Sequence, residues 1–440
     1  MTKDKAHRIG PIVLAPGITA REVFVFLTVT GIASTLTAFL NVMQPFVYSE
    51  VVGIGAEQQG RLAGQLMTVQ QFSVILFVGL AGALSDRIGR KILLLAALLG
   101  FCISALVYPI ISGVLALFVI RIFFGISSTF HTASGPAKFF DYPDNGSRGK
   151  FMALVMIWMA ILAAALIGGV GAHLPGWLQA AGASAREAGT WALWLAAALG
   201  LGVAAFGALF MMNDRPAKRP EAKPGLAGFV SGFREVMAQT RGNRSFATLV
   251  VTSFVVRTDD AVIASFLALW VTIQGAREGL STVHALEIAG VLTAIIRFMH
   301  LLVPPILGPL LDRFSRLAMY LVSIASVGAV FVCAPLVGSV SGWGIYVFAI
   351  LVGTVEASQT ICQQAFFGQE APSHLRATAY SLLAIFGTVS VIGASLAAGY
   401  LFDAIGPTAP FTLIGLLHVA AVILSLAVLG LMGRGRRAAG

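Results

Sequence analysis

The sequence predicts an all-α membrane protein with twelve transmembrane helices in two pseudo-symmetric six-helix bundles. Three observations support this fold class: the composition, an internal repeat and a count of apolar runs. Of the 440 residues, 58% are apolar and 11% are charged, whereas a soluble globular protein has roughly a quarter charged residues. Lipid is therefore the solvent for most of this chain.

An internal repeat divides the chain into two similar halves. The string GALSDRIGRK begins at Gly82, and a degraded copy, GPLLDRFSR, begins at Gly308. The aspartates of the two strings, Asp86 and Asp312, are 226 residues apart, which is slightly more than half of the chain. Such an offset is typical of a membrane protein that is built from two repeats.

Each predicted transmembrane helix corresponds to one apolar run. About 20 mostly apolar residues, at about 1.5 Å of rise each, cross the hydrocarbon core of a bilayer. Twelve runs have this length, and charged or glycine-containing loops separate them. The runs cover residues 22–46, 59–82, 91–111, 114–140, 149–173, 190–212, 245–273, 283–311, 317–338, 341–368, 374–402 and 409–433.

The basic residues predict the orientation, because cytoplasmic loops retain lysine and arginine. With both termini in the cytoplasm, 23 of the 29 lysines and arginines fall on the cytoplasmic side. The net charge of +10 therefore reflects topology and does not indicate a nucleic-acid partner. A basic inner face can also hold anionic membrane lipids. We expect an integral protein of a bacterial inner (plasma) membrane.

The spans and the charged segments define five regions. A cytoplasmic tail (1–21) precedes an N-terminal six-helix bundle (22–212), and a cytoplasmic linker (213–244) leads to a C-terminal six-helix bundle (245–433) and a second tail (434–440). Apolar residues of the linker recur at helical spacing, which predicts an amphipathic helix in the membrane interface; a short disordered tether is the alternative. These apolar residues are Leu226, Phe229, Val230, Phe233, Val236 and Met237.

Nothing in the sequence predicts an enzyme, a cofactor or a metal site. The motifs of zinc proteases, serine hydrolases and phosphate-binding loops are missing, and so is any large soluble segment. The cysteines, Cys102, Cys333 and Cys362, lie inside predicted spans and indicate neither a disulfide framework nor a metal cluster. We expect a monomer that binds a small-molecule substrate.

The arrangement of six spans, a basic linker and six more spans, together with the loop string, resembles the major facilitator superfamily of secondary transporters. Residues Gly82 to Lys91 match the G-x-L-x-D-R-x-G-R-K signature of that family completely. Residues Arg121 to Gly125 resemble its R-x-x-x-G motif in span four. Drug antiporters of the family usually carry a Gly-Pro in span five, and AALIGGVGA, which begins at Ala164, has none.

A second pair of charged loops supports the same duplication. Asp141 and Arg148 follow span four, and Glu370 and Arg376 follow span ten, 229 and 228 residues later. By resemblance, the charged loops form a conformational latch, because a carboxylate at a helix end can pair with cations and cap a neighbouring helix. The alternative is that they only fix loop geometry and topology. The latch residues are Gly82, Asp86, Arg87, Gly89, Arg90, Asp312, Arg316, Asp141, Arg148, Glu370 and Arg376.

Ionisable residues in the middle of the spans are the candidates for chemistry, because a charge at that depth is costly without a partner or a purpose. Arg297 lies fifteen residues before Asp312, about 22 Å at helical rise. The repeat offset of 226 residues pairs it with Gln71 of span two. Glu356 lies fourteen residues before Glu370 and reaches a similar depth.

Span seven places three more ionisable residues at this depth. Arg257 and Asp260 are three residues apart and can pair on one helix face. Asp259 then points about 100° away, toward Arg297 or Glu356 if spans seven, eight and ten meet. A carboxylate near a switchable arginine can couple proton and substrate movement. The alternative is a structural ion pair and a hydrogen-bonded Glu356.

The first half has fewer titratable residues. Arg121 either binds substrate or holds span four to its neighbours, and His131 either titrates or is a hydrogen-bonded core residue. We expect substrate contacts from Arg297, Gln71, Gln70, Arg257 and Arg121. We expect proton coupling at Asp259, Asp260, Glu356, His300 and His131.

The charges near the centre bear on the substrate. Central arginines suit a carboxylate or a phosphate, because a guanidinium offers paired donors to such an anion. The sequence thus predicts a proton-coupled secondary active transporter that moves a small organic, anionic or amphipathic solute by alternating access. The alternative is multidrug or cationic-compound efflux by proton antiport, in which Asp259, Asp260 and Glu356 bind the positive charge.

Overall fold

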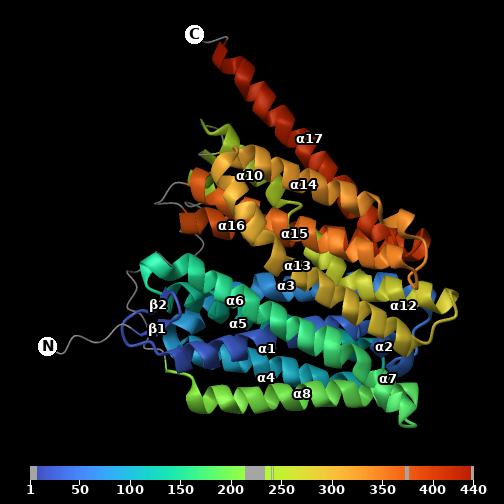
Figure 1. Ribbon diagram of the computed structural model, residues 1–440. Helices are drawn as coiled ribbons and strands as arrows, with labels where there is room; N and C mark the ends of the chain where they lie inside the picture. Colours follow the sequence, from blue (N-terminus) through green and yellow to red (C-terminus); the bar gives the residue numbers. More distant parts are fainter. Residues whose placement is uncertain (1–6, 214–232, 239, 241, 372–375, 438–440) are drawn as a thin grey trace. The chain divides into compact units, whose positions relative to one another are not determined.

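The chain folds almost entirely into helices (Figure 1). The computed structural model describes residues 7–213, 233–238, 240, 242–371 and 376–437. A short antiparallel β-hairpin precedes the first helix. The elements of the first half are β1 (Arg8–Ile9), β2 (Ile12–Val13), α1 (Ala20–Val42), α2 (Gln44–Phe46), η1 (Val47–Val51), α3 (Ala56–Ile88), α4 (Arg90–Val107), η2 (Tyr108–Ile110), α5 (Val114–Asp141), η3 (Asn145–Ser147), α6 (Arg148–Ala163), η4 (Ala164–Gly171), α7 (Ala172–Ala180) and α8 (Ala185–Phe210).

The second half has the same helical character. Residues 233–238 of the linker are helical, while Leu226, Phe229 and Val230 of the predicted amphipathic helix lie outside the described residues. The elements that follow are α10 (Arg244–Ser253), α11 (Thr258–Val262), η5 (Ile263–Leu267), α12 (Ala268–Arg277), α13 (Thr282–Arg313), α14 (Arg316–Val332), η6 (Ala334–Val337), α15 (Trp343–Glu370), α16 (Arg376–Ala404) and α17 (Ala409–Arg437).

The helices follow the predicted spans. In the part of the chain that the structure describes, 10 helices are long and apolar enough to cross a membrane, and they match spans one to six, eight and ten to twelve. Span nine is α14, an apolar helix of 17 residues. Span seven is divided into α10, α11, η5 and α12. The predicted all-α, twelve-helix membrane fold is therefore confirmed.

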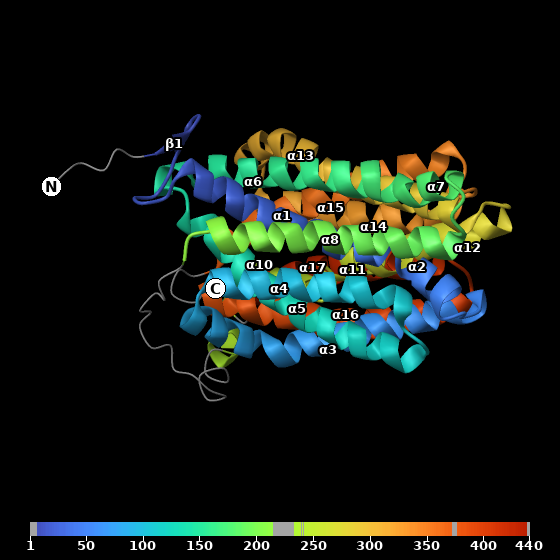
Figure 2. The same ribbon diagram turned by 90° about the horizontal axis from the view of Figure 1, so that it is seen from below.

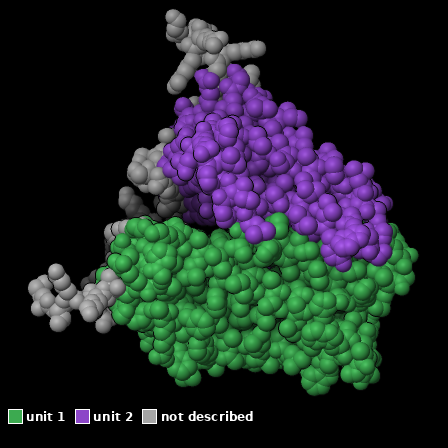
Figure 3. All heavy atoms as spheres, in the orientation of Figure 1, with its two compact units in different colours: residues 1–59, 72–217, 267–301 green, residues 60–71, 218–266, 302–440 purple. Residues whose placement is uncertain are grey.

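The helices pack into two compact units (Figure 3). Each unit contains helix segments from both halves of the sequence, because the first part of α3 packs in unit 2 and α12 with the first part of α13 packs in unit 1. The division into bundles 22–212 and 245–433 stays a prediction. Unit 1 comprises residues 1–59, 72–217 and 267–301, and unit 2 comprises residues 60–71, 218–266 and 302–440.

In unit 1, α8 lies along α1 and α4 (Figure 2). Helices α1 and α8 begin in the same way. Thr19 caps α1 and Ser184 caps α8, and in each case the glutamate three residues later, Glu22 or Glu187, returns a hydrogen bond to the cap residue. These reciprocal capping boxes satisfy backbone N–H groups that the first turn leaves without helical partners.

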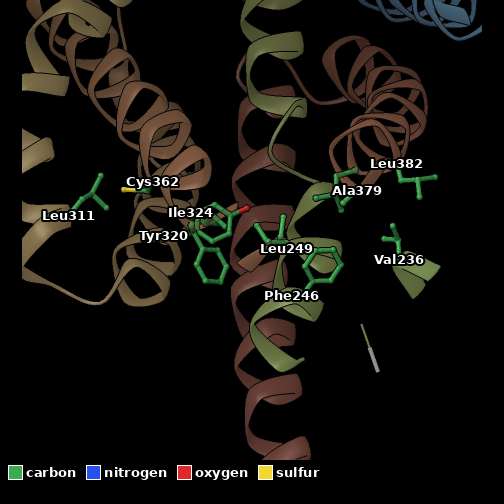
Figure 4. Packing of buried hydrophobic residues seen from close by; sticks show 12 residues of the cluster. Val236, Phe246, Leu249, Leu311, Tyr320, Ile324, Cys362, Ala379 and Leu382 are labelled. Carbon is green, nitrogen blue, oxygen red and sulfur yellow. The ribbon is translucent and has the colours of Figure 1, made fainter. Parts of the chain in front are cut away.

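The core of unit 2 contains part of the linker. Figure 4 shows Val236 beside a cluster that includes Phe246 and Leu249 of α10 and Leu382 of α16. Val236 is only 1% exposed, and the ring of Phe233 contacts Phe386 of α16 edge-on. The described end of the predicted amphipathic segment therefore packs against protein.

Unit 2 also contains a close crossing of α3 and α16. A Cβ atom on Gly399 would lie 2.5 Å from the carbonyl oxygen of Gly60 and 3.2 Å from Cα of Gly64, so the backbones approach through glycine. The carboxylate of Asp403, 3% exposed, accepts hydrogen bonds of 2.9 Å from the backbone N–H groups of Gly60 and Arg61. The crossing lies at the predicted outer ends of spans two and eleven.

Candidate functional site

Span seven is interrupted where its ionisable residues lie. Helix α10 ends at Ser253 and α11 begins at Thr258, with Arg257 as its N-cap residue. After five residues the helix widens into the π-helical segment η5. Arg257 and Asp260 are exposed, whereas Asp259 is buried. Breaks and π-helical turns of this kind are typical of ion and substrate sites in transporters.

Asp259 lies in the interior of unit 2, where it contacts α15 and α17. It is 2% exposed, and its Oδ2 accepts a hydrogen bond of 2.7 Å from Nε2 of Gln359 on α15. Nε2 of His418 on α17 lies 3.9 Å from the same oxygen. Among the described residues, no lysine or arginine contacts this carboxylate. An ionised carboxylate without a cation is costly at such a place, so the group is suited to binding a proton.

The hydrogen-bond partner of Asp259 differs from the residues that the sequence suggested. Arg297 is a residue of α13. Glu356 is 4% exposed and lies on α15, three residues before Gln359. Gln359, which the sequence did not suggest, is the partner that α15 supplies, and His418 adds a second titratable group to the site.

Unit 1 buries a positive charge at Arg121, which is 2% exposed. Its two terminal nitrogens donate to Oδ1 of Asn41 at 3.3 Å, and the guanidinium lies 4.8 Å from the ring centre of Phe124. We assign the Gln44 amide with its oxygen toward Arg121, where it accepts at 2.9 and 3.1 Å, because the opposite orientation would set donor against donor. Arg121 thus joins α5 to α1 and α2.

These partners of Arg121 are all uncharged. Among the described residues, no carboxylate lies within ion-pair distance of its guanidinium. A buried cation with neutral neighbours is costly, and a carboxylate or phosphate of a ligand would complete its environment. Each unit therefore buries an ionisable group without a described protein counter-ion: Arg121 in unit 1 and Asp259 in unit 2.

The remaining predicted substrate residues lie on α3 and α13. Gln70 is 9% exposed, and its Oε1 has no hydrogen-bond partner among the described residues. Gln71 is half-buried and donates to Sδ of Met67 at 3.8 Å. Arg297 is half-buried on α13. His300 contacts the carbonyl of the preceding helical turn through Nδ1 at 3.1 Å.

His131 of α5 has a polar and an aromatic neighbour. Its Nε2 lies 3.4 Å from Oγ of Ser34 on α1, and its ring meets Phe101 of α4 edge-on, with 6.2 Å between the ring centroids. This environment is typical of a hydrogen-bonded histidine between packed helices.

The repeated loop string has two different backbone conformations. Gly89, between α3 and α4, has φ of +88°, which favours glycine. At the equivalent position of the second copy, Ser315 has φ of −58° and caps α14 through its side chain. Lys91 ends the first string and donates from Nζ to the carbonyls of Ala208 and Met211, at 2.9 and 2.6 Å, at the end of α8. The glycine and the lysine thus fix local geometry.

The other latch residues are placed as follows. Glu370, at the end of α15, accepts a hydrogen bond of 3.0 Å from Nδ2 of Asn243, the N-cap residue of α10. The side chains of Asp86, Asp141 and Arg376 lie outside the described part of the structure. Gly82, Arg87, Arg148 and Asp312 are exposed, and Arg90 and Arg316 are half-buried.

Sequence reasoning did not find three residues of these sites. His418 stands alone in an apolar run, Gln359 is one of several polar residues of span ten, and only the fold brings the two to Asp259. Asp403 falls one residue beyond predicted span eleven and looks like a loop residue. It follows Gly399 by one helical turn, a signal of the crossing with α3 that the sequence does contain.

A family model covers the whole transmembrane region. Residues 24–299 and 249–439 match the model described as Major Facilitator Superfamily. Magnetosome protein MamH of Paramagnetospirillum magneticum is 23% identical over 406 residues, which cover 90% of this chain and 89% of the relative. Multidrug resistance protein MdtG of Salmonella arizonae is 25% identical over 395 residues, which cover 86% of this chain and 90% of the relative.

Solved transporters share the fold. The nucleoside transporter NupG gives a TM-score of 0.66 at 13% identity and covers 93% of this chain and 98% of its own. A D-xylose-proton symporter gives a TM-score of 0.65 at 16% identity and covers 92% and 97%. With 10 helices in its described part that are long and apolar enough to cross a membrane, and a family match along nearly all of its length, this chain belongs to the Major Facilitator Superfamily and is an integral membrane transporter.

Proposed function

We propose that the protein is a proton-coupled secondary active transporter that moves a small organic, anionic or amphipathic solute across a bacterial inner membrane. Asp259 carries the proposal: it is 2% exposed, hydrogen-bonded to the neutral Gln359, and without a lysine or arginine contact among the described residues. Such a carboxylate is stable when it holds a proton and costly when it does not. Its protonation can therefore be tied to the conformation of the transporter.

The arginines support an anionic or amphipathic solute. Arg121 is buried among neutral partners, and Arg297 lies half-buried on α13 of the same unit. A guanidinium binds carboxylate and phosphate through paired donors. An anion that accompanies a proton also crosses the membrane with less net charge, which lowers the electrostatic cost of the movement.

Movement of the solute follows alternating access. The repeat predicts two six-helix halves, 22–212 and 245–433, that rock around a central site. The close crossing of α3 and α16 is a contact between spans of different halves. Gly399 allows the two backbones to approach so closely that the crossing can close the central site at its predicted outer end. The latch residues of the charged loops act at the predicted cytoplasmic ends, where both termini also lie.

Efflux of cationic or amphipathic compounds is the second candidate. It is favoured by the 25% identity with Multidrug resistance protein MdtG and by the carboxylates Asp259, Asp260 and Glu356, which can attract an organic cation. In that case Asp259 exchanges a proton for the cation, and the same site serves antiport.

Proteoliposomes that contain the purified full-length protein test the proposal. A panel of labelled carboxylates and phosphate esters is offered beside a cationic dye, with and without an imposed pH gradient. We expect an organic anion to accumulate only with the gradient, and a protonophore to abolish the accumulation. Gradient-driven movement of the dye without any anion would favour the second candidate, and no gradient-driven movement of either class would contradict proton coupling.

Replacing Arg297 by lysine separates the two candidates. Lysine keeps the positive charge but loses the planar pair of donors that a carboxylate or phosphate uses. We expect the affinity for a transported anion to fall at least about tenfold, as expected for the loss of one charge-assisted hydrogen bond. The affinity is measured as the concentration of half-maximal uptake, and an unchanged value would favour the cationic alternative.

A further inference from the structure

His418 lies within α17, and its side chain is fully enclosed by unit 2. Its Nδ1 is 2.9 Å from the carbonyl oxygen of Ile414, one turn earlier on the same helix. Because a carbonyl oxygen only accepts hydrogen bonds, Nδ1 carries a hydrogen. In the neutral ring, Nε2 is then an acceptor.

This Nε2 faces Asp259, at 3.9 Å from Oδ2. An unprotonated Nε2 and an ionised carboxylate are both acceptors, and two buried acceptors that face each other are unfavourable. Among the described residues, neither Nε2 of His418 nor Oδ1 of Asp259 has a hydrogen-bond partner. One proton between the two side chains completes the contact, either as a carboxylic acid that donates to Nε2 or as an imidazolium that donates to the carboxylate.

The surroundings of the pair hold Asp259 in place. Gln359 donates to Oδ2 at 2.7 Å as a neutral group. On α16, the residues next to the break in span seven, Gly387 and Ser390, are also neutral. The titratable or charged side chains on the elements around the pair include Arg257 and Asp260 beside Asp259, Glu356 and Cys362 on α15, and Tyr320 on α14. The hydroxyl of Tyr320 shares a hydrogen bond of 2.7 Å with Thr252.

We propose that Asp259 and His418 together hold one proton, so that His418 is a second proton-coupling residue and α17 is part of the coupling site. On binding, one proton from the aqueous phase adds to the pair and changes its net charge from −1 to zero, and no other covalent bond forms or breaks. The role in transport rests on the function proposed above, whereas the sharing of the proton rests on the geometry of the pair.

Binding of the proton also changes the distance between two helices. A charge-assisted hydrogen bond of about 2.7–2.9 Å replaces the present 3.9 Å, so α11 and α17 approach each other by about 1 Å. Helix α11 has five residues, from Thr258 to Val262, between a turn and a π-helical segment. Because it is short and interrupted at both ends, it can shift while the rest of span seven stays in place.

Nitrogen-15 NMR of the full-length protein in lipid bilayers, labelled at histidine, tests the shared proton. The chain has 7 histidines, and the signal of His418 is identified by its loss in His418→Gln and its persistence in His7→Gln. If His418→Gln does not fold, the contact of Nδ1 with a carbon-13-labelled isoleucine carbonyl narrows the choice to His418 and His300, whose Nδ1 atoms lie beside Ile414 and Ile296. The loss of one of these two signals in His300→Gln then leaves that of His418.

We expect Nδ1 to stay protonated and the Nε2 signal to change as the pH is varied from about 5 to about 9. The signal moves to the protonated position if an imidazolium forms, and by a smaller hydrogen-bond shift if a carboxylic acid donates to Nε2. In Asp259→Asn the midpoint of this change should shift by at least about one pH unit, a tenfold change in proton affinity, or the change should vanish. The control is Asp403→Asn, which removes a buried carboxylate of the same unit without contacting His418. An Nε2 signal that is constant with pH, or that has the same midpoint in wild type and Asp259→Asn, would overturn the proposal.

Uptake by the same variants separates this inference from the proposed function. If the pH midpoint of the Nε2 signal shifts in Asp259→Asn while proton-driven uptake by this variant is normal, the shared proton is supported and its role in transport is contradicted. If Asp259→Asn loses proton-driven uptake while the pH midpoint of the Nε2 signal is the same as in wild type, the shared proton is overturned and the proposed function is retained.

Discussion

Replacing Gly399 by alanine is expected to force α3 and α16 apart. The new Cβ would lie 2.5 Å from the carbonyl oxygen of Gly60, where ordinary contact begins at 3.4 Å. The other atoms within reach are Cα of Gly64 and Cα of Arg61, at 3.2 and 3.3 Å. Because all three belong to the backbone, no side chain can rotate away, and the helices must separate by about 1 Å.

The size of the effect follows from overpacking. Inserting a methyl group into a tightly packed contact costs about 1–3 kcal/mol, and replacing glycine by alanine within a helix returns about 1 kcal/mol. Gly393→Ala is the matched control, because Gly393 lies on α16 and a Cβ there meets nothing within 4 Å. The gain in helix propensity is common to both variants, so their stabilities should differ by about 1–3 kcal/mol.

Thermal unfolding in detergent measures this difference. Cys333 is exposed and is replaced by serine in every variant, so that a thiol-reactive fluorogenic dye reports the exposure of Cys102 and Cys362, which are buried in the folded protein. Gly399→Ala should unfold a few degrees below Gly393→Ala. Equal midpoints for the two variants would refute the argument that the backbone contact closes the crossing.

Two further substitutions test local contacts in each unit. Lys91→Met removes the two hydrogen bonds to the end of α8 and should lower the free energy of unfolding by about 1 kcal/mol. The control is Lys150→Met, because the single backbone contact of Lys150 is 3.5 Å long. Equal thermal midpoints for the two variants would count against the capping role of Lys91. Tyr320→Phe removes the buried hydrogen bond of 2.7 Å with Thr252 and should lower the free energy of unfolding by about 1 kcal/mol in the same assay. Tyr380→Phe, at an exposed position, should leave the thermal midpoint unchanged. An equal decrease of the midpoint in both variants would contradict a specific role of the buried hydrogen bond.

The fold could be predicted from the sequence because lipid imposes strict requirements on a membrane-spanning chain. Ten of the twelve apolar runs correspond, among the described residues, to single helices long enough to cross a membrane, since a backbone in hydrocarbon must satisfy its hydrogen bonds within helices. The repeat offset pairs Gly89 with Ser315. It does not predict that their backbone conformations differ, because φ of +88° at Gly89 depends on how α3 and α4 meet.

The site could be predicted from the sequence only in part. The depth of Asp259 could be counted along span seven, but 245–273 reads as one apolar run without proline, and the break before Thr258 comes from packing. The contacts of Asp259 with Gln359 and His418 join residues that are far apart in the chain, and no periodicity reports them. The sequence places Arg121 within span four, but it does not show that the partners of Arg121 are the neutral Asn41 and Gln44.

Proton-driven accumulation by Asp259→Asn compared with wild type is the most direct test of proton coupling. Both proteins are reconstituted at equal density, and accumulation of a transported solute under a pH gradient is measured beside exchange of the same solute at equal pH. We predict that Asp259→Asn loses accumulation and keeps exchange, because asparagine resembles the protonated carboxyl group and cannot release a proton. Accumulation at the wild-type level in Asp259→Asn would contradict the account.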